Sequence, residues 1–142
     1  MSDLVDLRLR HLEVIQSVIN RLAQNSFTVR GWSVTLASVI FALITTQTVA
    51  NELKLLTLAP IWLFWGLDAF YLHQERLYRR LYSIVAASLS TADEEPAVPL
   101  FDMDISRCRP ITPSAARTAF SISVAAIPVM LTLVVVGFYL VS

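Results

Sequence analysis

The sequence predicts an all-α membrane protein with a helical hairpin and a third, C-terminal membrane-spanning helix. Three long runs of residues carry this prediction: residues 31–50 and 118–142 hold no charged side chain, and residues 55–72 hold only Asp68. Each run has about the 20 residues that a helix needs to cross roughly 30 Å of bilayer hydrocarbon. The composition agrees, because 56% of the 142 residues are hydrophobic and only 15% are charged. We therefore expect a single membrane domain over residues 1–142.

Residues 1–26 predict a cytoplasmic amphipathic helix. Leu12, Ile15 and Ile19 recur at spacings of three and four residues, and polar side chains fill much of the remaining surface. The helix either lies on the inner membrane face or packs against a partner helix. The second alternative is favoured, because surface-lying helices usually carry more lysine and aromatic residues. A kink or short turn is expected at residues 25–26, before the first span.

The first two spans are predicted at residues 29–50 and 55–72. Only a short external loop separates them, so they form an antiparallel hairpin. The second helix is expected to continue without a break into the cytoplasm, because Leu77 and Leu81 extend its apolar stripe to about Leu89.

Residues 73–116 are expected to be a cytoplasmic helix followed by an acidic, proline-bearing linker. Asp93 lies in this linker. Residues 101–105 alternate apolar and acidic side chains, which predicts a short strand or an extended docking segment. The third span is predicted at residues 117–141.

The basic residues predict the orientation in the membrane. Ten of the eleven lysines and arginines lie before or at the start of the first span, or between the second span and the start of the third, and only Lys54 does not. Because flanking basic residues stay on the cytoplasmic side, we expect an inner-membrane, multi-pass protein with a cytoplasmic N-terminus and a periplasmic or external C-terminus. The formal net charge is zero, so direct nucleic-acid binding is not expected.

Asp68 is the sharpest candidate for a functional residue. A charged side chain at the bilayer centre costs about 2.5–3.5 kcal/mol on insertion scales and usually faces the protein interior. Asp68 lies close to the cytoplasmic boundary of its span, and Arg30 lies near the same boundary on the antiparallel neighbour. An intramembrane polar pair of Asp68 and Arg30 is therefore geometrically reasonable. The pair sets a gate or a subunit contact, or it is a structural tie between helices. A carboxylate that reaches up to water is the remaining alternative.

The first span also carries a face of small and hydroxyl residues at helical spacing. Close approach along small residues favours helix association in lipid. This face packs against another span of the same chain, forms a subunit seam, or lines a polar pore. It consists of Gly31, Thr35, Ser38, Ala42 and Thr45.

A charged cluster follows the second span and consists of Glu75, Arg76, Arg79 and Arg80. Glu75 and Arg79 are four residues apart, which favours an ion pair along the helix. The cluster is expected to contact anionic lipid of the inner leaflet or to dock a soluble partner.

No arrangement of residues predicts catalysis, a metal site or a cofactor, and we expect a protein that is not an enzyme. Cys108 lies between Arg107 and Arg109, which would lower its pKa if the thiol is exposed, and we expect a free cytosolic thiol. The isolated histidines, His11 and His73, are expected to be polar residues at the membrane boundary.

Residues 11–36 (HLEVIQSVINRLAQNSFTVRGWSVTL) and 64–82 (FWGLDAFYLHQERLYRRLY) resemble a family of small uncharacterised bacterial multi-pass membrane proteins. The predicted architecture is also similar to SLATT-type antiphage effectors, although a third span departs from their two-span plan. The resemblance implies a homo-oligomeric membrane effector that a sensor triggers and that then damages the host membrane. It carries over no catalytic residues.

The favoured function is a gated pore or membrane-disrupting effector in bacterial antiphage defence, with the lipid bilayer and further copies of the chain as partners. An alternative is a membrane anchor or accessory subunit that recruits a soluble cytoplasmic sensor or enzyme through residues 1–25 and 73–116. A small transporter is less favoured, because no internal repeat or pair of broken spans is visible.

Overall fold

The structure, a computed structural model, describes residues 2–46, 58–90 and 98–141. These residues form helices and connecting turns without a strand, which confirms the all-α fold class. The helices are α1 (Ser2–Thr46), α3 (Leu58–Ser90), the short 3-10 helix η2 (Ser106–Ile111), α4 (Ala115–Ala119) and α5 (Ile122–Val141).

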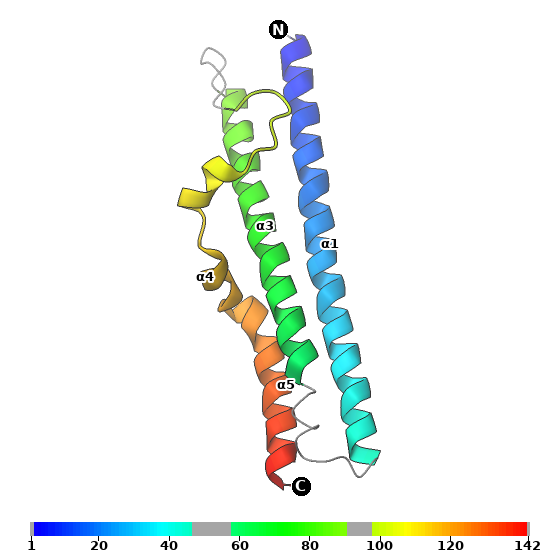
Figure 1. The fold of residues 1–142 in the computed structure, drawn as a ribbon. Helices are drawn as coiled ribbons and strands as arrows, with labels where there is room; N and C mark the ends of the chain where they lie inside the picture. Colours follow the sequence, from blue (N-terminus) through cyan, green and yellow to red (C-terminus); the bar gives the residue numbers. More distant parts are fainter. Residues whose placement is uncertain (1, 47–57, 91–97, 142) are drawn as a thin grey trace.

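Two long antiparallel helices, α1 and α3, form the frame of the molecule (Figure 1). The N-terminus lies at one end of this frame and the C-terminus at the other. From the end of α3 the chain returns along the same helix through η2, α4 and α5. A helix of 45 residues such as α1 is roughly 65–70 Å long, about twice the thickness of the bilayer hydrocarbon.

α1 passes through residues 25–26 without a break, so the kink or turn predicted there is wrong. Asparagine and serine keep their backbone N–H groups, unlike proline, and so interrupt a helix only when their side chains compete for backbone bonds. Ser26 is buried and gives its hydroxyl to Asp68 on α3 instead. The tertiary contact therefore removes the competition.

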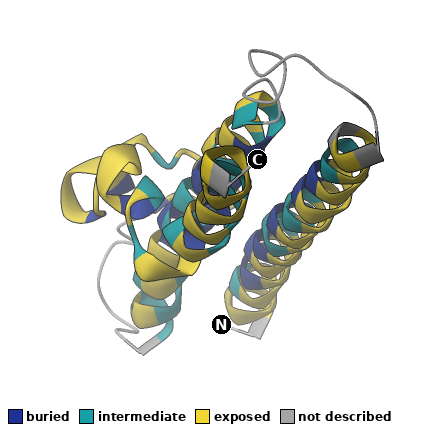
Figure 2. Cartoon of the chain, turned by 90° about the horizontal axis from the view of Figure 1, so that it is seen from below, coloured by how far each residue is buried: buried dark blue, intermediate teal, exposed yellow. Residues whose placement is uncertain are grey.

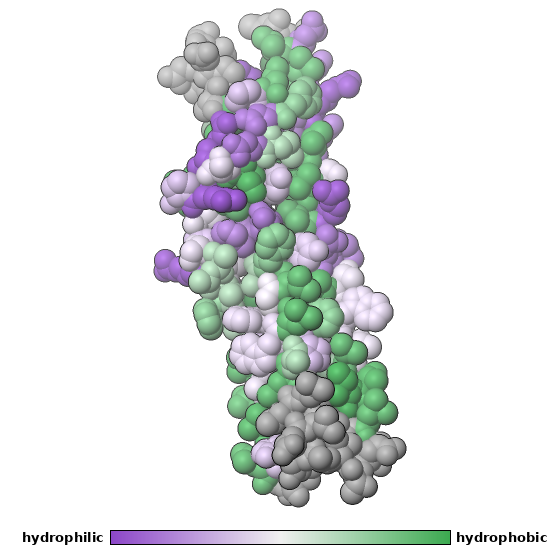
Figure 3. Space-filling view, in the orientation of Figure 1, coloured by the Kyte–Doolittle hydropathy of each residue, from purple (hydrophilic) through white to green (hydrophobic). Residues whose placement is uncertain are grey.

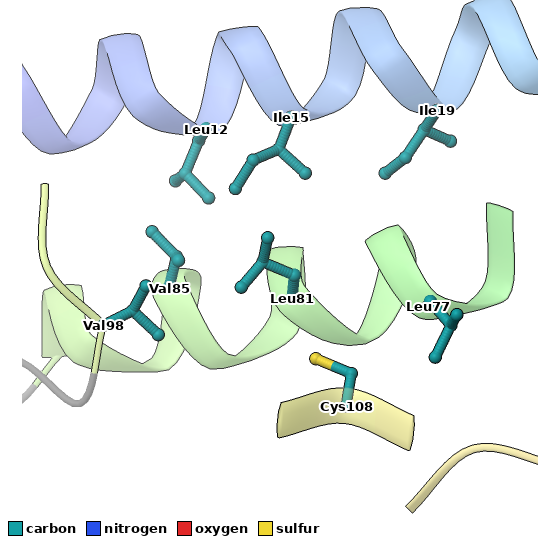
Figure 4. Packing of buried hydrophobic residues seen from close by; sticks show 8 residues of the cluster. All are labelled: Leu12, Ile15, Ile19, Leu77, Leu81, Val85, Val98 and Cys108. Carbon is teal, nitrogen blue, oxygen red and sulfur yellow. The ribbon is translucent and has the colours of Figure 1, made fainter. Parts of the chain in front are cut away.

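An apolar core joins α1 and α3 near the N-terminus. Leu12, Ile15 and Ile19 on α1 face the later turns of α3, as their spacing predicted (Figure 4). The predicted continuation of the second helix beyond Leu72 is confirmed, since α3 runs to Ser90. The cluster consists of Leu12, Ile15, Ile19, Leu77, Leu81, Val85, Val98 and Cys108.

Residues 98–111 wrap over this core, and we call them the strap. Met103 and Ile105 pack against the core cluster, so the segment docks on helices of its own chain and forms no strand. Asp102 and Asp104 each accept a hydrogen bond from the backbone N–H two residues later, and these turns coil the chain. Phe101 adds a left-handed backbone conformation with φ 60°. The predicted acidic linker around Asp93 lies outside the described residues.

The third predicted span, residues 117–141, begins later than expected. α4 ends at Ala119, the chain turns at Phe120 and Ser121, and α5 starts at Ile122. The Ser121 side chain bends back and donates to the Thr118 carbonyl (2.7 Å), which competes with a continuous helix.

The molecule has two chemically different ends. We define the polar end as residues 2–29, 73–90 and 98–119, and the apolar end as residues 30–46, 58–72 and 120–141. Figure 3 shows, on the face that it draws, most of the hydrophilic side chains gathered over the polar end.

Two described helices are long and apolar enough to cross a membrane. They are α1, over Asp3–Leu43, and α5, over Ile122–Leu140. Only 17% and 11% of their most apolar windows are buried within the chain, so these apolar side chains face outward. Figure 2 shows the same pattern, with exposed residues around much of each helix.

The described part of α3 does not meet this criterion. Residues 47–50 of the first predicted span and 55–57 of the second lie outside the described residues. Three complete spans therefore stay a prediction.

Candidate functional site

The predicted pair of Asp68 and Arg30 is present at the start of the apolar end. Arg30 Nε donates to Asp68 Oδ2 at 2.7 Å, and Ser26 Oγ donates to the other carboxylate oxygen. The antiparallel course of α1 and α3 brings these residues together, because Ser26 and Arg30 lie one turn apart on the face of α1 that packs on α3. The Asp68 side chain is 5% exposed and that of Arg30 is 29% exposed.

Ser26 was not anticipated as a partner of Asp68, although its position offered a signal. It precedes Arg30 by four residues and therefore lies on the same side of the helix. Both carboxylate oxygens of Asp68 are bonded within one chain, so the arrangement matches a structural tie between helices. It does not match a contact on the surface of a subunit.

Three helices enclose this pair. The space beside it is about 10 Å³, which is close to the minimum for one water molecule. No conduit for ions passes through the described part of one chain at this point. The lining residues are Arg30, Ser33, Ile61, Phe64, Trp65, Asp68, Val124, Ile127 and Pro128.

The small-residue face of α1 is turned mostly toward the outside of the described structure, and Ser38 borders a small pocket shared with Leu131 and Val134 of α5. Its five members (Gly31, Thr35, Ser38, Ala42 and Thr45) are all exposed, whereas Ser33 and Ala37 are buried. The expectation of packing against another span of the same chain is therefore not met by the face as a whole, although Ser38 borders α5. The reason is that α1 is one continuous helix. Its inward face is set by Ile19 in the core of the polar end and continues at helical spacing through Ser33 and Ala37.

The exposed hydroxyls on this face are satisfied by their own helix. Thr35 donates to the Gly31 carbonyl at 3.0 Å, Ser38 to the Val34 carbonyl at 2.8 Å, and Thr45 to the Ala42 carbonyl at 2.9 Å. Because these hydroxyl donors are hydrogen-bonded, exposing this face to lipid leaves none of them unpaired.

The charged cluster after the second predicted span is split between the interior and the surface. Glu75 is buried and pairs with Arg79 Nη2 at 2.6 Å, which confirms the expected i,i+4 pair. Arg76 is half-buried and donates to Thr118 Oγ1 at 3.2 Å. Only Arg79 and Arg80 are exposed.

Glu75 is thus wrongly assigned to an exposed docking surface. It lies seven residues, or about two helical turns, after Asp68, and so shares the inward face of α3.

His11 and Cys108 also lie deeper than expected. His11 is 1% exposed, with Nε2 at 3.1 Å from the Asp102 carbonyl and its ring against Phe101. Cys108 lies in the core, where loss of water raises the pKa of its thiol. The opposing effect of Arg107 is smaller, so the lowered pKa expected for an exposed thiol does not occur.

The described residues include no group of three or more histidine, cysteine, aspartate or glutamate side chains that could hold a metal ion. His73 is half-buried, and its Nδ1 has no hydrogen-bond partner among the described residues.

Fold and site together define an antiparallel helical hairpin with one polar and one apolar end, tied at the boundary by an ion pair whose carboxylate is buried. The chain matches no known protein family, no curated protein and no solved structure. Membrane insertion and self-association are therefore argued from the molecule itself.

Proposed function

We propose that this protein is an oligomeric inner-membrane effector that forms a gated pore, or otherwise disrupts the membrane, in bacterial antiphage defence. The protein would insert into the membrane, associate with further copies of itself, and act in defence.

Membrane insertion is supported by the large apolar side chains exposed over the apolar end. Leu63 is 65% exposed, Leu133 67% and Leu140 76%. Exposed apolar surface on this scale is unusual for a soluble monomer but is what lipid-facing helices present. With the polar end in the cytoplasm, as the arginine distribution predicts, about half of α1 and of α3 would project from the membrane as a stalk.

Self-association is supported by the exposed small-residue face of α1 within the apolar end, which is the main observation in favour of the proposed function. In lipid no hydrophobic force drives helices together, so close approach of backbones along small residues is what favours association. A Cβ added to Gly31 would meet no atom within 4 Å. The space next to this residue is therefore open to a second copy.

A pore requires several copies under this proposal. One chain encloses only about 10 Å³ near Asp68. Helices from neighbouring copies would have to surround any conduit, and the hydroxyl-bearing positions Thr35, Ser38 and Thr45 would then lie at or near the subunit seam. The link to defence rests on the resemblance of residues 11–36 and 64–82 and on the similarity of architecture to SLATT-type effectors.

The test compares two glycine substitutions that are equivalent within one chain. Gly31 and Gly66 are both exposed helical residues with open space at the Cβ position. Gly31→Leu places a bulky side chain on the small-residue face, and Gly66→Leu places the same side chain on the outer surface of α3. We expect Gly31→Leu to shift the purified protein toward smaller species in detergent and to reduce dye leakage from liposomes. Gly66→Leu should leave both unchanged.

Gly31→Leu should likewise reduce toxicity on overexpression in bacteria, and Gly66→Leu should leave it unchanged. Equal behaviour of the two variants would refute the proposed seam. A wild-type protein that leaves liposomes tight and cells unharmed, yet still protects them from phage, would refute the pore.

A membrane anchor that recruits a soluble enzyme or sensor is the second candidate, and one observation favours it. Leu4, Val5, Leu9 and Val14 are each 45–58% exposed on the polar end, where lipid would not cover them. Leu9 also lines an open groove of about 550 Å³ between α1 and α3. If this candidate is correct, Leu4→Glu/Leu9→Glu should release a stoichiometric soluble partner, and the wild-type protein should leave liposomes tight.

A further inference from the structure

A basic groove lies on the polar end, next to the boundary with the apolar end. One wall is α3, with Arg76, Arg79, Arg80 and Ser83, and the other is the turn between η2 and α4, with Thr112 and Pro113. Its volume is about 410 Å³, within the range of small-molecule sites. Local sequence alone would not reveal it, because its walls are about thirty residues apart.

The groove carries an excess of positive charge. Three guanidinium groups line it, and the one carboxylate paired with them is the buried Glu75, which bonds Arg79. Arg76 donates one of its N–H groups to Thr118 Oγ1. The Arg80 guanidinium makes no ion pair among the described residues.

The hydrogen bonds of the lining residues select the class of ligand. Ser83 donates its hydroxyl to the Arg80 carbonyl at 2.7 Å, and Thr112 donates to the Cys108 carbonyl at 2.8 Å. The donors left for a ligand are therefore the remaining guanidinium N–H groups. Several arginine forks around one space match the oxygen atoms of a phosphate group, which accepts charge-assisted bonds from more than one of them.

The position of the groove indicates where the phosphate comes from. Arg76 contacts Thr118, and the chain two residues later exposes Phe120 (74%) and then Ile122 (88%) at the start of α5. Trp65 Nε1 donates to the Ala119 carbonyl at 3.1 Å, so an aromatic belt residue lies at the same level. A lipid whose headgroup occupies the groove would thus have apolar side chains next to its acyl chains.

We propose that the groove of Arg76, Arg79 and Arg80 binds the phosphate of an anionic phospholipid of the inner leaflet. This inference rests on the membrane insertion proposed above. It adds a defined headgroup site that fixes the depth and rotation of the hairpin. The same chemistry would accept a free phosphate, which lies outside the proposal and is an arm of the test.

The test uses the full-length protein in detergent micelles and phosphatidylglycerol as the probe, with phosphatidylcholine and inorganic phosphate for comparison. The test variant is Arg76→Gln/Arg80→Gln, which leaves the pair of Glu75 and Arg79 intact. The control is Arg10→Gln/Arg21→Gln, which removes the same charge from exposed positions of α1. Circular dichroism and size-exclusion chromatography check that each variant is folded.

Native mass spectrometry measures the bound lipid. We expect phosphatidylglycerol to be retained by the wild type and the control. Its affinity should fall roughly 25-fold in the test variant, at about fivefold for each of the two arginines. Arg80→Lys should give an intermediate loss, because lysine keeps the charge but not the planar fork. Millimolar inorganic phosphate should displace little of the lipid.

Three results would overturn the inference. These are equal lipid binding by the two double variants, equal binding of phosphatidylglycerol and phosphatidylcholine by the wild type, and tight binding of inorganic phosphate without lipid. Flotation with phosphatidylcholine vesicles tests insertion separately. A protein that floats but shows no headgroup preference loses only this inference, whereas a protein that does not float refutes the proposed function as well.

Discussion

Substitution of Asp68 tests the tie between α1 and α3 at the boundary of the apolar end. Asp68→Asn keeps the size of the side chain but removes its charge. An asparagine amide also presents one oxygen and one NH₂ group where the carboxylate presents two oxygens. Because Ser26 and Arg30 both donate to Asp68, the variant satisfies only one of the two donors.

The expected loss follows from the burial of the two partners. Removing one member of a buried ion pair costs about 3–5 kcal/mol. Arg30 keeps 29% of its side chain exposed and can turn toward water at the boundary. We therefore expect Asp68→Asn to cost about 2–3 kcal/mol of unfolding free energy, somewhat below that range. Arg30→Gln leaves a carboxylate that is only 5% exposed with one donor, and should cost about 3–5 kcal/mol.

The assay is a double-mutant cycle in mixed micelles, in which unfolding by a denaturing detergent is followed by circular dichroism. The double variant Asp68→Asn/Arg30→Gln buries no lone charge. It should be destabilised by only about 2 kcal/mol, which gives a coupling energy of roughly 3 kcal/mol or more. Asp93→Asn, in the part of the chain outside the described residues, serves as the control and should change little. If the two single effects add to within about 0.5 kcal/mol, or if Asp68→Asn behaves like Asp93→Asn, the reasoning is refuted.

Three further predictions concern the polar end. Leu81→Ala, in the fully buried core, should lower the free energy of unfolding by about 2–5 kcal/mol. Leu63→Ala, at a 65% exposed position, should lower it by less than about 1 kcal/mol. Equal losses in the same denaturation assay would contradict the assigned core. Cys108 should react with a maleimide at least about tenfold more slowly in the folded protein than in the denatured chain, because burial shields the sulfur and raises the pKa of its thiol; equal rates would place the thiol at the surface. Hydrogen bonds from Ser106 hold the pKa of Asp104 below its ordinary value of 3.8. The stabilisation of the folded state by this carboxylate is therefore complete above pH 3.8 and is lost as the pH falls through the folded-state pKa. The wild type should therefore lose more stability on acidification below pH 3.8 than Asp104→Asn does, and parallel stability curves would refute the role of these bonds.

Helical periodicity was enough to predict much of the frame. The spacing of Leu12, Ile15 and Ile19 predicted the core face of α1, because residues three and four apart share one side of a helix. The pair of Asp68 and Arg30 was predictable for a related reason. A short loop between two helices makes them antiparallel, and charged residues near the same boundary then lie at the same height.

The strap was harder to predict, because its contacts join residues that are distant in the sequence. The alternation of residues 101–105 fits a strand, but Asp102 and Asp104 use their side chains to form turns, and no neighbouring strand is available among the described residues. The burial of Cys108 depends on α1 and α3 together. Its arginine neighbours would lower the pKa only of an exposed thiol, and sequence adjacency does not report burial.

Composition and local periodicity are enough to predict that the chain has a polar end and an apolar end and that its frame is helical. The side of α1 that faces inward in the apolar end depends instead on tertiary packing. α1 is one continuous helix, so the packing of Ile19 in the polar core fixes the rotation of every later turn. That rotation buries Ser33 and Ala37 and leaves the face of Gly31 exposed, where the proposed contact with a second copy lies.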